Sequence, residues 1–180
     1  MTVSAHDVAA ILRQQLPGIG VKKLHKLLYY CQGHHLASFG EPLFTETVSA
    51  WDMGPVVGEL WYAEKRGHAR GTPGTLGQGA LNTVGYVLSR YGALTGEDLE
   101  RLTHSEPPWQ QADQLRTPGA SVRIERDWMR DYFRTDGAAE IPSLDPGALR
   151  DWLGSAPDRL SSGVHADSPD EILRRLGRVA

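Results

Sequence analysis

The stretch that decides the fold reads Val21-Lys-Lys-Leu-His-Lys-Leu-Leu-Tyr-Tyr-Cys-Gln-Gly-His-His-Leu36. Its apolar residues recur at spacings of three and four, which predicts an amphipathic helix over about 21–39. Gly40 follows directly and is placed to end the helix in a left-handed conformation. We expect the buried side of this helix to hold Val21, Leu24, Leu28, Cys31 and His35.

The opposite side of this helix carries Lys22, Lys26 and Tyr29, which we expect to face outward and to contact a protein partner. Tyrosine is enriched in interface hot spots, which favours that interpretation. Lysines beside aromatic rings also bind nucleic acid through phosphate contacts and stacking. A nucleic-acid-binding regulator that uses the face from Lys22 to Tyr30 is therefore the alternative function. A solvated basic face, with the tyrosines partly in the core, is the third interpretation.

Gly33 lies in the middle of the same helix, where glycine costs up to about 1 kcal/mol relative to alanine. Such a residue is tolerated where another backbone or a large ring comes close. We expect that neighbour to be Trp51 or the bend at Gly54-Pro55. These three residues are predicted to belong to the scaffold, with Trp51 buried, Gly54 extended before proline, and Pro55 starting a helix.

The rest of the chain predicts further helices and one small β element. Ser4 can cap a helix over 5–16, and 47–51 is a short strand or half of a small hairpin. Residues 67–79 are rich in glycine and predict a loop. Additional helices are predicted over 80–91, over 96–104 after a capping box at Thr95, and over 121–134.

A shift to Gly, Ala and Pro after residue 134 marks a boundary. We therefore predict a mainly α fold, with one compact helical domain over 1–134 and a linker with a short helical C-terminal extension over 135–180. Two short helices are expected in the extension, at 147–153 and 172–178. The second carries Ile172, Leu173 and Leu176, which we expect to fold onto a partner.

The composition limits the class of protein. The 180 residues carry a net charge of −3, the pI is about 6.1, and Cys31 is the one cysteine. A general nucleic-acid binder usually shows a basic excess, so nucleic acid is not the expected partner. A single cysteine excludes an internal disulfide and favours the cytoplasm. No signal peptide and no membrane-spanning run are visible, so no membrane partner is expected.

Two groups of residues could carry chemistry. His25, Cys31, His34 and His35 share a helix, but one helix face offers at most two ligands, and a structural zinc site needs four. His104-Ser105-Glu106 contains the residue types of a hydrolase, yet neighbours in sequence do not generally assemble a triad. We expect no catalytic residue, no metal and no cofactor, and structural roles for His104 and Trp109.

Four motifs resemble the Panacea domain, the family of SocA-like antitoxins and many phage-associated proteins. They are Lys23-Leu-His-Lys-Leu-Leu-Tyr-Tyr-Cys-Gln-Gly-His-His35, Gly40-Glu-Pro-Leu-Phe44, Ala50-Trp-Asp-Met-Gly-Pro-Val56 and Leu102-Thr-His-Ser-Glu-Pro-Pro-Trp109. The resemblance covers about residues 8–133. In the family pattern, Gln, Ala and Trp stand where this chain has His25, Cys31 and His34.

The resemblance implies an antitoxin of a bacterial or phage toxin–antitoxin pair, which neutralises a co-encoded toxin mostly by direct protein binding. The SocA-like branch is also linked to delivery of the toxin to a protease. The implied partners are therefore the cognate toxin and a cellular protease, in a homo- or hetero-oligomer. The domain is shared across unrelated toxin types, so the resemblance does not identify the toxin.

Overall fold

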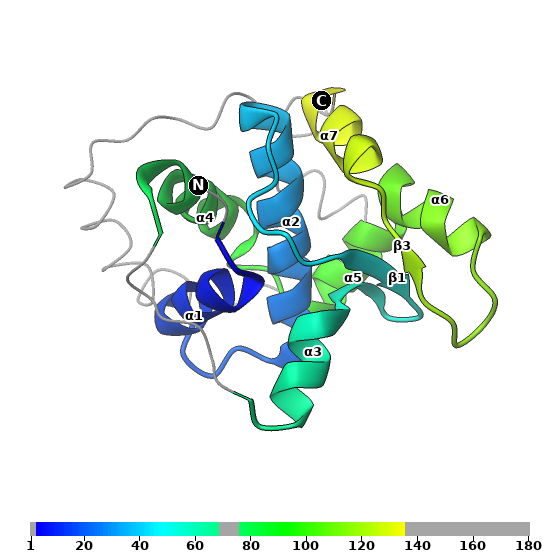
Figure 1. The fold of residues 1–180 in the computed structure, drawn as a ribbon, viewed down its shortest axis with the longest axis horizontal. Helices are drawn as coiled ribbons and strands as arrows, with labels where there is room; N and C mark the ends of the chain where they lie inside the picture. Colours follow the sequence, from blue (N-terminus) through cyan, green and yellow to red (C-terminus); the bar gives the residue numbers. More distant parts are fainter. Residues whose placement is uncertain (1–2, 69–75, 136–180) are drawn as a thin grey trace.

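The computed structural model describes residues 3–68 and 76–135 (Figure 1). Within these two ranges the chain is mainly helical with a small sheet, as the sequence predicts. The C-terminal extension lies outside the described residues, and so do Ile172, Leu173 and Leu176. The elements are α1 (Ala5–Gln15), α2 (Val21–Phe39), β1 (Val48–Trp51), β2 (Gly54–Val57), α3 (Gly58–Lys65), α4 (Gln78–Tyr91), α5 (Gly96–His104), α6 (Pro107–Gln114), β3 (Val122–Arg123) and α7 (Arg126–Thr135).

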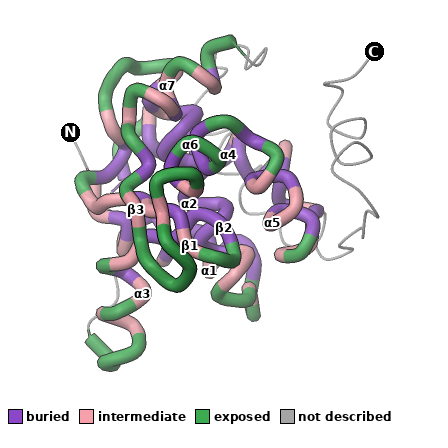
Figure 2. Tube along the Cα trace, turned by 90° about the vertical axis from the view of Figure 1, so that its right-hand side faces the viewer, coloured by how far each residue is buried: buried purple, intermediate pink, exposed green. Residues whose placement is uncertain are grey.

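Helix α2 is the centre of the fold. It contacts α1, α4, α5, α7 and β2. The four contacting helices lie around it in Figure 1. Residues 24–34 of α2 are all buried, so burial is not confined to one stripe of the helix, and the part of α2 visible in Figure 2 is coloured as buried. The predicted outward face is therefore wrong for Lys26 and Tyr29, which are 1% and 0% exposed. Val21, expected in the core, is instead exposed at the first turn.

Capping residues set the helix ends at the predicted places. Ser4 and Asp7 form a capping box at the start of α1, and the Ser4 hydroxyl also donates to Glu46 Oε1 at 2.8 Å. Thr95 and Asp98 form the same arrangement at the start of α5. Gly40 ends α2 with a φ of 74°, a conformation that glycine adopts without steric cost.

The sheet has the strand order β2-β1-β3 and is antiparallel. The hairpin of β1 and β2 realises the small hairpin that the sequence allowed. The third strand, β3, differs from the prediction, which is a helix over 121–134. The helix begins only at Arg126, and Val122–Arg123 form the strand. Val122 pairs with Ala50, and the Ile124 N–H donates to the Val48 carbonyl at 2.9 Å. This pairing with a distant strand overrides the helical pattern at the start of that segment.

Pro55 is a strand residue and does not start a helix, so that prediction is wrong. It lies in β2, at the edge of the sheet, opposite Ala50. An edge strand tolerates proline because the missing N–H is not needed for pairing on the open side. That side is covered by α2: the Lys26 amine donates to the Pro55 carbonyl at 3.3 Å, and the Val57 N–H donates to His25 Nδ1 at 3.1 Å.

Gly54 also departs from the prediction, since its φ is 100° rather than extended. This is a conformation that favours glycine. Space is a second reason, because a Cβ atom at Gly54 would lie 2.5 Å from Lys26 Cε. The β1–β2 turn thus requires glycine both for its backbone shape and for the passage of a lysine side chain.

The large ring that Gly33 predicts is present, but it belongs to Phe133 of α7 and not to Trp51. A Cβ atom at Gly33 would overlap the Phe133 ring. Phe133 is fully buried and packs edge-on against Tyr29 and Tyr30.

Among the described residues, no helix combines the length and the hydrophobicity needed to cross a bilayer.

Candidate docking site

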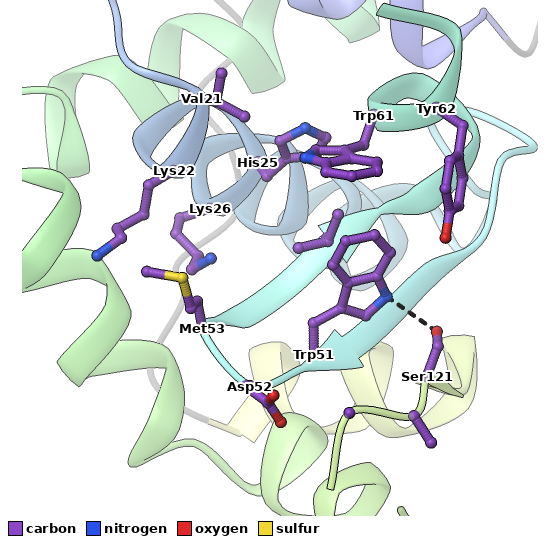
Figure 3. Close-up of a pocket in the computed structure, with 13 residues that line it drawn as sticks. Val21, Lys22, His25, Lys26, Trp51, Asp52, Met53, Trp61, Tyr62 and Ser121 are labelled. Atoms are coloured by element: carbon purple, nitrogen blue, oxygen red, sulfur yellow. Dashed lines mark hydrogen bonds between the residues drawn. The ribbon is translucent and has the colours of Figure 1, made fainter. Parts of the chain in front are cut away.

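One hollow of about 530 Å³ opens beside the β1–β2 hairpin. It lies between the first turns of α2, the hairpin, α3, and the segment that leads into β3 (Figure 3). We call it the aromatic hollow. Its lining residues are Val21, Lys22, His25, Lys26, Trp51, Asp52, Met53, Val56, Trp61, Tyr62 and Gly119 to Ser121.

Three aromatic rings form one wall of this hollow. The Trp51 and Trp61 rings meet edge-to-face with centroids 5.3 Å apart, and Tyr62 lies 5.0 Å from Trp61. The Trp51 indole N–H donates to the Ser121 hydroxyl at 3.0 Å, which fixes the ring beside β3 (Figure 3). Trp51 is therefore a half-buried wall residue, and the prediction that it is buried in the scaffold is wrong.

The hollow also gathers exposed apolar side chains. Val21, Met53 and Tyr62 are each more than half exposed, and all three line it. Scattered exposed apolar residues are ordinary on a soluble protein, whereas apolar residues grouped around a concave surface mark an interaction site. The described residues include five large exposed apolar side chains in total, so this grouping is not spread evenly over the surface.

Arg116 fixes the β1–β2 turn, which lines the hollow, to the end of α6. Its guanidinium bonds Asp113 at 2.5 Å and also pairs with Asp52 in the β1–β2 turn. The hydrogen bond from Arg116 keeps the pKa of the Asp52 carboxyl below its usual range. The turn is thus tied to the end of α6, and the negative charge of Asp52 is already matched within the chain.

The structure separates the three α2 residues that were predicted to contact a partner. Lys22 is half-buried at the hollow and pairs with Glu100 at 2.6 Å and Glu97 at 3.5 Å, so a partner contact there stays a prediction. Tyr29 points inward, and its hydroxyl donates to Glu106 Oε2 at 3.0 Å. Burial raises the pKa of Tyr29 well above its usual value.

Lys26 differs from both, because it is buried and yet lines the hollow. Burial lowers the pKa of its amine to about 8. A lysine is expected to lose affinity for its proton when water is removed from around the charged form. The side chain crosses from α2 to the β1–β2 turn, where its end lies against Gly54.

The histidines and the cysteine of α2 make packing contacts. His25 Nδ1 accepts from the Val57 N–H, and burial lowers the pKa of His25 to about 4. His34 Nε2 bonds the Tyr91 hydroxyl at 2.9 Å, and His35 Nδ1 bonds Thr83 Oγ1 at 2.7 Å. Cys31 is buried, which raises the pKa of its thiol. Within the described ranges, no group of three or more His, Cys, Asp or Glu could hold a metal ion.

His104 and Glu106 point to different places. The His104 ring stacks on Trp109 with centroids 4.0 Å apart. Glu106 is buried and accepts hydrogen bonds from the hydroxyls of Tyr29 and Tyr30. The hydrolase-like triplet therefore serves packing and the attachment of α6 to α2.

Sequence reasoning missed Met53, Trp61, Tyr62 and Ser121 as site residues. Met53 and Trp51 flank Asp52 on a tight turn, and a turn tip that carries large apolar residues is a usable signal of exposure. Trp61 and Tyr62 lie on the short helix α3, of which only Leu60 is buried, so neither ring is enclosed by the core. Ser121 offered no comparable signal, because its position depends on the pairing of β3.

The geometry is that of a small helical domain with an aromatic-lined hollow and an interior rich in hydrogen-bonded polar side chains. Residues 24–110 match the family model described as antitoxin SocA-like, Panacea domain. This match confirms the resemblance to the Panacea domain over that range and supports an antitoxin-like role. Comparisons with curated proteins and with solved structures found no match.

Proposed function

We propose that this chain is the antitoxin of a bacterial or phage toxin–antitoxin pair and that it neutralises the toxin by direct contact at the aromatic hollow. One observation carries the location: three of the five large exposed apolar side chains in the described residues line this hollow. The family match over residues 24–110 carries the class of partner.

The residue types at the hollow suit a protein interface. Tryptophan and tyrosine dominate interface hot spots because they bury a large area at a low cost in side-chain entropy. Trp51 is already held by Ser121 and packed on Trp61, so little of its freedom is left to lose on binding. A toxin segment that covers these rings would also cover Val21 and Met53.

Neutralisation by binding requires no catalytic group, and the proposed role is not enzymatic. A cellular protease is a second proposed partner, in line with what the SocA-like branch implies. It would act on the toxin while the antitoxin holds it. We assign no binding site for the protease on this chain.

The alternative function, a nucleic-acid-binding regulator, depended on an exposed face from Lys22 to Tyr30. Lys26, Tyr29 and Tyr30 are buried, and Lys22 is paired with Glu97 and Glu100. That face offers little free positive charge for phosphate contacts. We therefore do not propose this alternative.

Co-expression tests the proposed function. The chain is produced with the protein of the neighbouring reading frame, and growth and co-purification are measured together. We expect growth rescue with a stable complex. A Trp51→Ala, Trp61→Ala double variant should lose both, whereas Phe39→Ala, at the other end of α2, should lose neither. Growth rescue without a complex, while the toxin persists, would argue for an indirect mechanism.

A further inference from the structure

Lys26 is a buried cation without a matched anion. Lys26 is 1% exposed, and its amine donates a hydrogen bond to the neutral Pro55 carbonyl at 3.3 Å. Among the ion pairs of residues 3–68 and 76–135, none includes Lys26. An ammonium group has three N–H donors, so this environment leaves it incompletely satisfied.

The acidic groups near the hollow are already engaged elsewhere. Glu100 attracts the Lys26 charge, but its carboxylate bonds Lys22 at 2.6 Å. Asp52, the one carboxylate among the lining residues, is paired with Arg116. The hollow therefore presents a positive charge that these groups do not balance at contact distance.

His25 supplies a second donor at the same hollow. Because Nδ1 accepts from the Val57 N–H, the proton of the neutral ring is on Nε2. That Nε2 atom is buried and has no hydrogen-bond partner among the described residues. A buried donor without an acceptor is costly, which makes an acceptor from outside favourable.

We propose, on the basis of the proposed function, that the toxin inserts an aspartate or glutamate side chain into the aromatic hollow. Its carboxylate pairs with the Lys26 amine and comes within reach of His25. Apolar residues beside that acid cover Trp51, Met53 and Tyr62. The recognised element is thus an acidic side chain within an apolar segment of the toxin.

The charge balance favours a carboxylate over a phosphate. One unmatched lysine neutralises one carboxylate, whereas a phosphate group carries a charge of about −1.5 to −2 at neutral pH. The excess negative charge would be placed in a partly dehydrated hollow, where an unmatched charge is expensive. A neutral segment could accept a hydrogen bond from His25 but would leave the charge of Lys26 without a matching anion.

The test uses Lys26→Met, which keeps most of the aliphatic stem and removes the charge. The Lys26→Met variant should still fold, because the substitution removes a buried charge that no anion matches. Affinity for the purified neighbouring protein should fall by about 30-fold or more, as expected when one partner of a buried charge pair is removed. Each Asp and Glu of that protein is then changed to Asn or Gln. One of these variants should lose affinity in the wild-type background and lose little more in the Lys26→Met background.

A measurement on the unmodified chain guards against a folding defect in the variant. NMR titration of the Lys26 side chain should show that its pKa rises when the neighbouring protein binds, because a carboxylate stabilises the ammonium form. If Lys26→Met binds as tightly as the wild type while Trp51→Ala binds weakly, the inference is wrong and the proposed function stands. If the wild type itself forms no complex, the proposed function fails. Competition by inorganic phosphate, with no toxin acid coupled to Lys26, would also overturn the inference.

Discussion

The ring of Phe133, near the end of α7, lies against Gly33 in the middle of α2, in the space that a Cβ atom would need. The same ring packs on Tyr29 and Tyr30, whose hydroxyls bond Glu106 just before α6. Helices α6 and α7 are therefore both fixed on the central helix. The segment between them carries Ser121, so this packing also holds one wall of the aromatic hollow.

Gly33→Ala should destabilise the fold. Alanine gains up to about 1 kcal/mol in helix propensity, but overpacking against Phe133 costs about 1–3 kcal/mol. The overlap with a fully buried ring places this cost at the upper end, so we expect a net loss of about 2 kcal/mol in the free energy of unfolding, measured by urea denaturation. Gly79→Ala is the matched control, because a Cβ atom there would meet its neighbours at 3.6 Å or more. A Gly33→Ala variant as stable as the wild type would contradict this packing.

Much of the helical framework could be predicted from local signals. The bounds of α2 follow from its apolar spacing and from Gly40, and the capping boxes at Ser4 and Thr95 mark two helix starts. These features depend on residues within a few positions of one another. Local signals predict the wrong conformation for Pro55 and for the segment around Val122, because pairing with β1 sets the conformation of both.

The site was harder to predict than the fold. A one-sided stripe on α2 implied that Lys26 and Tyr29 face solvent, but neighbours surround this helix and its polar groups bond in the interior. Periodicity identifies a helix without showing how many sides are covered. The aromatic hollow joins α2, the hairpin, α3 and the segment before β3, so its residues are adjacent only after the chain has folded.

The buried amine of Lys26 predicts that stability rises with pH above neutrality. The folded pKa is about 8 and the unfolded value is 10.5, so the unfolded chain binds more protons between these values. The free energy of unfolding should therefore increase between pH 7.5 and 9.5 by about 2 kcal/mol more in the wild type than in Lys26→Met. Denaturation of both proteins across this window measures the difference. If the stability of the two proteins changed with pH in the same way, folding would not lower the pKa of Lys26, and this prediction would be wrong.

His25 predicts a loss of stability on the acid side. Burial lowers its folded pKa to about 4, compared with 6.5 when unfolded, so the unfolded chain binds the extra proton as the pH falls through this window. Between pH 7 and pH 5, His25 should cost about 2 kcal/mol of stability. His25→Gln keeps an acceptor for the Val57 N–H and cannot titrate, so its acid sensitivity should be smaller by that amount. His35, whose pKa is also lowered, is present in both proteins and cancels.

The central claim is that the toxin docks on the aromatic hollow, and the affinity of the neighbouring protein for single variants tests it most directly. Trp51→Ala and Trp61→Ala should each weaken binding by about 30-fold or more, as expected for hot-spot residues. The control is Phe39→Ala, an exposed aromatic residue at the opposite end of α2, roughly 27 Å from Val21 at 1.5 Å per residue. The account predicts folded variants, weak binding for the two tryptophan changes and wild-type affinity for Phe39→Ala. Equal affinity for all four proteins would contradict it.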